Sequence, residues 1–321
     1  MSVQRVQVSA PSRLHFGMLA FGQPGARQFA GVGAMIDSPG VRLSISPGQR
    51  LEASGPASGR VLAFARSFLE AADWLDRPAA AVIEVEAAPP EHVGLGSGTS
   101  LGMAVALGLN AFFDGPWTRA EQLAQAVGRG RRSAIGVYGA LSGGLLVDGG
   151  KLADGTISPL VSRVTLPEAW RFVLLSAPGE QGLSGEAERQ AFERLPAVPA
   201  EVSADLCRQV LLELLPSAAS GDFERFGESL YEFGRRAGEC FASQQGGAYA
   251  SPRVERLIEQ VRRMGVRAAG QTSWGPTVFA LLADEPQARQ FVRDVQAESL
   301  GLDATISAPA AGGSHVVKRP A

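Results

Sequence analysis

A glycine-rich segment followed directly by an apolar stretch constrains the fold of this chain most strongly. The segment reads PPEHVGLGSGTS over residues 89–100, and residues 101–113 then show apolar helical spacing. Gly94, Gly96 and Gly98 allow backbone turns that residues with a Cβ disfavour, so successive N–H groups can converge on a phosphate at the positive end of the helix. The segment therefore predicts an anion cradle, although a Gly-rich turn can also be only a tight connection.

Hydroxyl side chains within the segment add candidate phosphate ligands. Ser97, Thr99 and Ser100 can bond phosphate oxygens or a phosphate-bound metal. The spacing is not that of a Walker A loop, because no Lys follows the last Gly, and it is not the dinucleotide-binding fingerprint. The segment thus favours phosphate binding without specifying the ligand.

Charge balance and composition exclude several classes of protein. The 30 basic and 32 acidic residues nearly cancel, so the bulk charge does not favour a nucleic-acid partner. Two cysteines are too few for a disulfide framework or a cysteine metal cluster, and they suit a reducing compartment. Residues 1–13 lack the apolar core of a signal peptide, and no apolar stretch reaches spanning length. We therefore expect a cytoplasmic protein without a membrane partner.

The order of expected elements indicates an α+β fold with two domains, because helices cluster instead of alternating with strands. We place the boundary within residues 159–167, which gives domains of residues 1–163 and 164–321. In the first we expect strands at 3–9, 41–46, 81–86 and 145–148, a turn or second strand at 13–17, and helices at 59–73, 101–113 and 119–128. In the second we expect strands at 170–176, 266–269, 277–282 and 304–308, helices at 201–216, 223–241, 252–264 and 285–299, and a frayed tail from Ala311.

Three arginines cluster in the segment GRGRRS, residues 128–133. Arg129, Arg131 and Arg132 repel one another unless an anion lies between them, and guanidinium forks match phosphate geometry. The two neighbouring glycines let a ligand approach the backbone. A solvated basic helix end, favoured by the helix dipole, is the alternative.

Arg13 and His15 alternate with apolar residues near the N-terminus. Both side chains lie on one face if the segment is extended. They could hold a carboxylate or a phosphate, or they could face solvent, as isolated polar residues on strands often do.

Two later segments carry further candidates. Asp148 and Lys151 surround a Gly-Gly turn, so they are either hairpin residues or site residues. Thr272 and Ser273 lie in the expected loop 270–276, which combines hydroxyls with an amide and an aromatic ring. Such loops often contribute to sites, although an ordinary hairpin connection is the alternative.

Together these segments resemble the GHMP small-molecule kinase superfamily. Its second motif has the form PxxxGLGSSAA, and residues 90–100 read PEHVGLGSGTS. Within it the chain looks most like the beta-ribofuranosylaminobenzene 5'-phosphate synthase family. The matching stretches are PSRLHFG at 11–17, GVG at 31–33 with Ile36, Asp37 and Pro39, the segment 128–150, and SWGPTV at 273–278. The chain departs from that family at Lys151, where His is usual, and at Arg131 and Arg132, which replace small residues, so these positions affect substrate preference.

The resemblance implies an N-terminal domain of the ribosomal protein S5 domain 2-like type and a ferredoxin-like C-terminal domain, with the site between them. It implies that 5-phosphoribosyl 1-diphosphate and 4-aminobenzoate or 4-hydroxybenzoate combine, with loss of carbon dioxide and pyrophosphate, in methanopterin biosynthesis. It also implies Mg²⁺, no organic cofactor, and a homodimer.

Two missing acidic residues separate kinase from synthase within this resemblance. The kinases place an acidic base in a segment of the form SGxD, and the matching residues 133–136 end in Gly136. Their magnesium-binding Glu is also missing, since residues 125–127 carry no carboxylate. A positioned base contributes ~100-fold or more to rate, so its absence argues against phosphoryl transfer to an alcohol. We predict the synthase, with a GHMP kinase and a non-catalytic ligand-binding protein as alternatives.

The predicted roles follow from the demands of phosphoribosyl transfer, which are neutralising the leaving group and immobilising the ring. The diphosphate is assigned to Gly94, Gly96, Ser97, Gly98, Thr99 and Ser100, with Ser97 or Thr99 on Mg²⁺, and the phosphates to Arg129, Arg131 and Arg132. Arg13 and His15 would orient the benzoate or the ribose phosphate, Thr272 and Ser273 would close the cleft, Asp148 would stabilise developing positive charge or hold the metal, and Lys151 would serve the leaving group.

Overall fold

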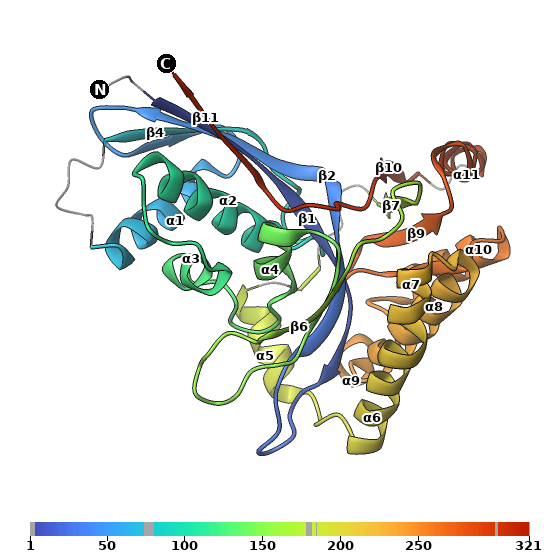
Figure 1. Ribbon diagram of the computed structural model, residues 1–321. Coiled ribbons are helices and arrows are strands. Elements are labelled where there is room, and N and C mark those ends of the chain that lie inside the picture. The colour runs from blue at the N-terminus through green and yellow to red at the C-terminus, as the bar shows by residue number, and fades with distance from the viewer. Residues whose placement is uncertain (1–3, 74–79, 178–181, 184, 299–300, 321) are drawn as a thin grey trace.

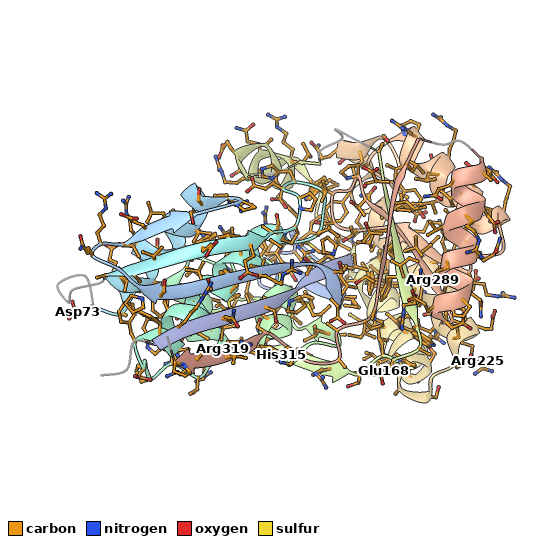
Figure 2. All side chains as sticks on the ribbon, turned by 90° about the horizontal axis from the view of Figure 1, so that it is seen from above. Asp73, Glu168, Arg225, Arg289, His315 and Arg319 are labelled. Carbon is orange, nitrogen blue, oxygen red and sulfur yellow. The ribbon has the colours of Figure 1, made fainter. Side chains whose placement is uncertain are left out.

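Two β-sheets organise the chain in the computed structural model, which describes residues 4–73, 80–177, 182–183, 185–298 and 301–320. Val3 and Ser299, which end two of the expected elements, lie outside these ranges. Viewed from above, Asp73 lies at one end of the molecule, and Arg225 and Arg289 lie at the other (Figure 2).

The first sheet is built around two long strands, β1 (Gln4–Ala20) and β2 (Ala30–Pro47), which pair antiparallel. Its strands follow the order β11-β1-β2-β4-β3, and β5 pairs with the first half of β2 and with β6. The shorter strands are β3 (Glu52–Ser54), β4 (Ala81–Ala87), β5 (Leu145–Asp148), β6 (Leu160–Val164) and β11 (His315–Pro320). Figure 1 shows β11 running beside β1, so the end of the chain returns to this sheet.

One face of the first sheet is covered by helices (Figure 1). They are α1 (Ser58–Ala71), α2 (Ser97–Phe112), α3 (Ala120–Ala126) and α4 (Ile135–Ser142). In β4 the alternate residues Ala81, Ile83 and Val85 are buried against α1 and α2, whereas Glu84 and Glu86 are exposed. This alternation fixes which face of the strand carries the core.

The second sheet has the order β10-β7-β9-β8. Its strands are β7 (Arg171–Ser176), β8 (Ala268–Gln271), β9 (Val278–Leu282) and β10 (Asp303–Ser307). The helices α8 (Phe223–Glu239), α10 (Pro252–Arg263) and α11 (Glu285–Ala297) contact this sheet. The other helices of this half of the chain are α5 (Gly185–Arg194), α6 (Ala200–Gln209), α7 (Leu215–Ser220) and α9 (Ala242–Gln245), with the π-helix η1 (Val210–Leu214) between α6 and α7.

A shared core joins the two sheets. Phe16 of β1 packs against Phe172 and Phe279 of the second sheet, with ring centroids 6.4 Å and 5.2 Å away. Leu230 and Phe233 of α8 belong to the same buried cluster. Because β1 contributes to both halves, the sheets hold a fixed relation, and the site can form between them.

The predicted α+β class is confirmed, and the expected helices and strands are found near their places. Three expectations are wrong. β1 does not break at Pro11, because a register shift between Ala10 and Ser12 accommodates the proline. Helix α2 begins at Ser97, inside the predicted turn. The tail from Ala311 is not frayed, because His315–Pro320 pairs with β1 along its edge.

The structure also contains elements that the sequence did not predict, namely the first half of β2 and all of β3, β6, β11, α4, α5 and α9. The boundary between residues 163 and 164 stays a prediction. The tail assigned to the second domain, however, completes the sheet of the first.

Candidate active site

A cavity of about 1150 Å³ opens where the glycine-rich segment, the arginine segment, β1 and α5 meet. Its lining differs from one part to another. We call the part lined by Arg60, Arg129 and residues 96–99 the basic end, and the part lined by Phe29, Phe192, Phe241 and Trp274 the aromatic end. Arg13, His15 and Arg132 also line this cavity.

The glycine-rich segment adopts a backbone that requires glycine at two positions. Gly94 has φ +89°, and a Cβ there would lie 2.3 Å from the carbonyl oxygen of Thr272. Gly96 has φ +67° and caps α2, and a Cβ there would lie 2.9 Å from Arg13 Nε. The glycines therefore let the segment fit between β1 and the loop after β8.

The N-terminus of α2 faces two guanidinium groups. A Cβ at Gly98 would lie 2.7 Å from an Arg60 nitrogen and 3.6 Å from an Arg129 nitrogen. Gly96 supplies no side-chain cap, so the first N–H groups of α2 are available to an anion. Ser97 and Thr99 line the cavity, whereas Ser100 is buried and its hydroxyl has no hydrogen-bond partner. The basic end thus combines helix dipole, amides and cations.

Arg129 is the least compensated of these cations. Its guanidinium lies 4.6 Å from the Phe64 ring centroid, and its Nε is buried without a partner. Burial, followed by the charges of Arg60 and Arg131, lowers its pKa. Arg60, in contrast, is paired with Glu91. An anion at the N-terminus of α2 would relieve the repulsion that Arg129 experiences.

Arg13 and His15 are held by the loop after β8. The Thr272 hydroxyl accepts a hydrogen bond from the His15 N–H at 3.0 Å and donates one to the Gly94 carbonyl at 2.9 Å. The Ser273 N–H donates to the His15 carbonyl at 2.9 Å. Thr272 is fully buried behind the cavity, and Ser273 lines it. These bonds fix β1 against the glycine-rich segment.

The side chains of Arg13 and His15 present unpaired polar atoms at the cavity. Arg13 Nη1 and His15 Nε2 are buried without hydrogen-bond partners. Burial lowers the pKa of Arg13 to about 10, while Glu188 raises it and Arg132 lowers it. Burial, with the charges of Arg13 and Arg132, lowers the pKa of His15 well below its usual value. His15 is therefore neutral at neutral pH and is not the solvent-facing residue of the alternative interpretation.

Asp148 and Lys151 are not among the residues that line the cavity. The Asp148 carboxylate accepts hydrogen bonds from the Ser133 hydroxyl and the Ala134 N–H, both at 2.8 Å, and from the Gly150 N–H at 3.1 Å. Burial, the largest effect, raises its pKa. Lys151 Nζ donates to the Arg131 carbonyl at 3.0 Å. These contacts fasten the arginine segment from behind and leave the direct roles predicted for both residues as predictions.

The sequence reasoning missed the aromatic end. The Trp274 ring lies 5.0 Å from Phe241 and 5.4 Å from Phe192, and Phe192 lies 5.6 Å from Phe29. These residues come from four separate segments, so no local pattern indicates that they meet. Arg60 and Glu188 were missed for the same reason.

The described carboxylates of the cavity are all paired with arginine. Glu91 binds Arg60, Glu188 binds Arg132, and Glu186 and Glu193 both bind Arg189. No group of three or more His, Cys, Asp or Glu side chains that could hold a metal occurs within the described ranges. At the kinase-base position, a Cβ on Gly136 would lie 3.1 Å from Thr99 Cγ2. The Thr99 side chain therefore leaves little room for a side chain at residue 136.

Two family models match the chain, "GHMP kinases N terminal domain" over residues 60–144 and "GHMP kinases C terminal" over residues 211–299. The first contains the glycine-rich and arginine segments just described. The chain belongs to the GHMP kinase superfamily. This membership confirms the resemblance and the fold that the motifs predicted.

Curated GHMP proteins named beta-ribofuranosylphenol 5'-phosphate synthase are similar to this chain over most of its length. The protein of Methanothermobacter thermautotrophicus is 29% identical over 298 residues, covering 87% of this chain and 89% of its own. That of Archaeoglobus fulgidus is 28% identical, covering 86% and 87%. An enzyme of the synthase type is therefore supported, and the substrates are left to the proposal below.

A solved GHMP-fold structure, mevalonate pyrophosphate decarboxylase from Streptococcus pyogenes, aligns with a TM-score of 0.70 over 97% of this chain and 98% of its own, at 13% identity. At this identity the likeness shows the fold alone. Within the described residues, no helix has the length and apolar character needed to cross a membrane.

Proposed function

We propose that this protein is a decarboxylating phosphoribosyltransferase. It would join 5-phosphoribosyl 1-diphosphate to a 4-substituted benzoate and release carbon dioxide and pyrophosphate. The name of its relatives refers to a ribofuranosylphenol, so 4-hydroxybenzoate is the first acceptor to test and 4-aminobenzoate the second. The methanopterin pathway and a homodimer stay predictions.

The observation that carries the proposal is the joining of a basic end and an aromatic end in one cavity. The N-terminus of α2 with Arg60 and Arg129 suits a diphosphate, because amides and guanidinium groups stabilise phosphate oxygens. The rings of Phe192, Phe241 and Trp274 suit an aromatic ring packed edge to face. A substrate pair with these two parts fills both ends.

The proposed reaction also suits a cavity without a free carboxylate base. The bond from C1 of the ribose to the diphosphate breaks, and its electron pair leaves with pyrophosphate. The ring carbon that bears the carboxylate then bonds to C1, and the electron pair of its bond to the carboxylate returns to the ring as carbon dioxide leaves. With both substrates fully ionised, no proton is gained or lost. An alcohol kinase, in contrast, must remove a proton from its substrate, and Gly136 offers no base.

Mg²⁺ fits the hydroxyl groups present, because this ion binds one or two protein oxygens, substrate phosphates and water. Ser97 and Thr99, which line the cavity at the start of α2, would hold it. When bound, the ion would neutralise charge on the leaving diphosphate. Asp148, Lys151 and Thr272 would act as positioning residues, because they contact the segments that carry the arginines, Gly94 and His15.

The test is to incubate the protein with 5-phosphoribosyl 1-diphosphate, Mg²⁺ and carboxyl-labelled 4-hydroxybenzoate or 4-aminobenzoate. Labelled carbon dioxide is expected with at least one of them. A parallel reaction with ATP and small alcohols tests the kinase alternative. ATP-dependent phosphorylation without decarboxylation of either benzoate would contradict the proposal, and ligand binding without turnover would favour the non-catalytic alternative.

A further inference from the structure

One carboxylate lies where the two ends of the cavity meet. Glu188 of α5 binds Arg132 at 2.5 Å, and its side chain is 20% exposed. The Arg132 guanidinium lies 4.8 Å from the centroid of the Phe192 ring, which contacts Trp274 at the aromatic end. Glu188 thus lies beside the rings.

Glu188 also acts on the residue that reaches the basic end. Arg13 lies against Gly96, at the cap of α2, and its pKa is raised by Glu188 more than by Asp148. The carboxylate therefore acts on a residue that lies beside the diphosphate cradle, and it also borders the ring site. In the proposed reaction, C1 of the ribose lies between these two sites.

The other described carboxylates of the cavity are placed differently. Glu186 and Glu193 share Arg189, and their side chains are 61% and 59% exposed, so water screens their charges. Glu91 binds Arg60 beside the diphosphate cradle. Asp148, which the sequence suggested for stabilising positive charge, lies outside the lining. Glu188 is the half-buried carboxylate at the junction.

We propose that Glu188 is a catalytic residue whose carboxylate stabilises the positive charge that develops at C1 as the diphosphate leaves. This role rests on the proposed function, in which C1 of the ribose is the reacting atom that the Glu188 carboxylate would face. Glu188 forms no covalent bond and transfers no proton, because the electron pair of the broken bond leaves with pyrophosphate and the ring supplies the new pair. A fixed charge acts most strongly on a transition state where it is shielded from water, and the Glu188 side chain is only 20% exposed.

Arg132 would act through Glu188 as a positioning residue. The two side chains are joined by an ion pair, and Phe192, four residues after Glu188 on α5, contacts the same guanidinium. An arginine held from both sides keeps the carboxylate in one orientation. Charge on Arg132 alone would disfavour a cation, so the pair works as a unit.

The test compares Glu188→Gln with Glu186→Gln, a matched change two residues earlier on α5. Steady-state kinetics are measured with 5-phosphoribosyl 1-diphosphate and the benzoate that the wild type uses, and calorimetry measures the binding of inorganic pyrophosphate. Glu188→Gln is expected to lower kcat about 100-fold or more while KM and pyrophosphate affinity change little. Glu186→Gln should remain within about twofold of wild type, since exposed pairs contribute little. Glu188→Asp, which keeps the charge, should recover part of the lost kcat.

A purely structural role of Glu188 in holding α5 predicts a different pattern, in which KM rises, kcat is preserved and Arg132→Gln reproduces the effect. That pattern, or an unchanged kcat in Glu188→Gln, would overturn the role of Glu188. The proposed function would still stand if the wild type releases carbon dioxide. A wild type without that activity overturns both. If Glu188→Gln loses pyrophosphate binding, Glu188→Asp decides, because a raised KM with an unchanged kcat in that variant would contradict a catalytic charge.

Discussion

The basic and aromatic ends of the cavity recognise a ligand by different physical means. The basic end is centred on the short segment of residues 96–99 and uses backbone geometry, with Gly96 at φ +67° and the start of α2 facing Arg60 and Arg129 from two other segments. The aromatic end is assembled from rings far apart in sequence, which pack against one another. Recognition at the first end depends on charge and at the second on shape. Changes at each end should therefore affect different ligands.

Gly96→Val is expected to produce the largest difference between ligand affinity at the basic end and ligand affinity at the aromatic end. Valine disfavours positive φ, and its Cβ would meet Arg13 Nε at 2.9 Å. We expect the affinity for inorganic pyrophosphate, measured by calorimetry, to fall about 100-fold, which corresponds to about 2.7 kcal/mol, while benzoate affinity changes far less. Gly59→Val is the control, because a Cβ there meets no atom within 4 Å. Unchanged pyrophosphate affinity in a folded Gly96→Val protein would show that the cradle is misassigned.

A smaller effect of the same kind is expected for Arg129→Ala. A charge-assisted hydrogen bond contributes about 1.5 to 3 kcal/mol, so pyrophosphate affinity should fall about 10-fold or more. Arg129→Lys should recover only part, since an ammonium lacks the planar fork. Arg119→Ala, at an exposed arginine that does not line the cavity, is the control. Equal small losses in all three variants would favour a solvated basic surface over a phosphate site.

The aromatic end should respond to Phe241→Leu. The Phe241 ring packs 5.0 Å from both Trp274 and Phe21, and such aromatic pairs contribute about 0.5 to 1.5 kcal/mol beyond buried area. We expect the KM for the benzoate to rise several-fold and pyrophosphate affinity to stay constant. Phe112→Leu, which changes a ring paired with Phe113 outside the cavity, is the control. A loss of pyrophosphate affinity in Phe241→Leu would remove the distinction between the ends.

The smallest effect concerns pH and stability at the junction of the two ends. Burial and two arginine charges hold the pKa of His15 well below its usual value of about 6.5. Below that pH the unfolded chain binds a proton that folded His15 does not, so stability present at neutral pH is lost as pH falls. In thermal unfolding, His15→Gln should weaken this loss, whereas His92→Gln, at an exposed histidine, should not. Equal pH dependence in wild type and His15→Gln would contradict the burial argument.

The basic end is centred on residues that are neighbours in the chain, whereas the aromatic end depends on residues that are far apart, and this difference explains how much of the site could be predicted from the sequence. The cradle was predictable because Gly94, Gly96 and the α2 start are neighbours in the chain, and local geometry decides their conformation. The shared face of Arg13 and His15 was predictable from strand alternation, whereas the burial of His15 depends on the loop after β8, which is distant in sequence. Phe192, Phe241 and Trp274 meet only through tertiary packing, so no spacing indicates them. The direct role of Asp148 stays a prediction, and its hydrogen bonds to Ser133 and Ala134, which hold the arginine segment, could not be read from the sequence because they form only in the folded protein.

The central claim is that both ends serve one reaction. It is tested most directly by measuring pyrophosphate and carbon dioxide in a single turnover of the wild-type protein with 5-phosphoribosyl 1-diphosphate, Mg²⁺ and the labelled benzoate. Pyrophosphate and carbon dioxide should appear in equal amounts and at the same rate. Pyrophosphate released without carbon dioxide would mean that the basic end works alone, and that result would contradict the account.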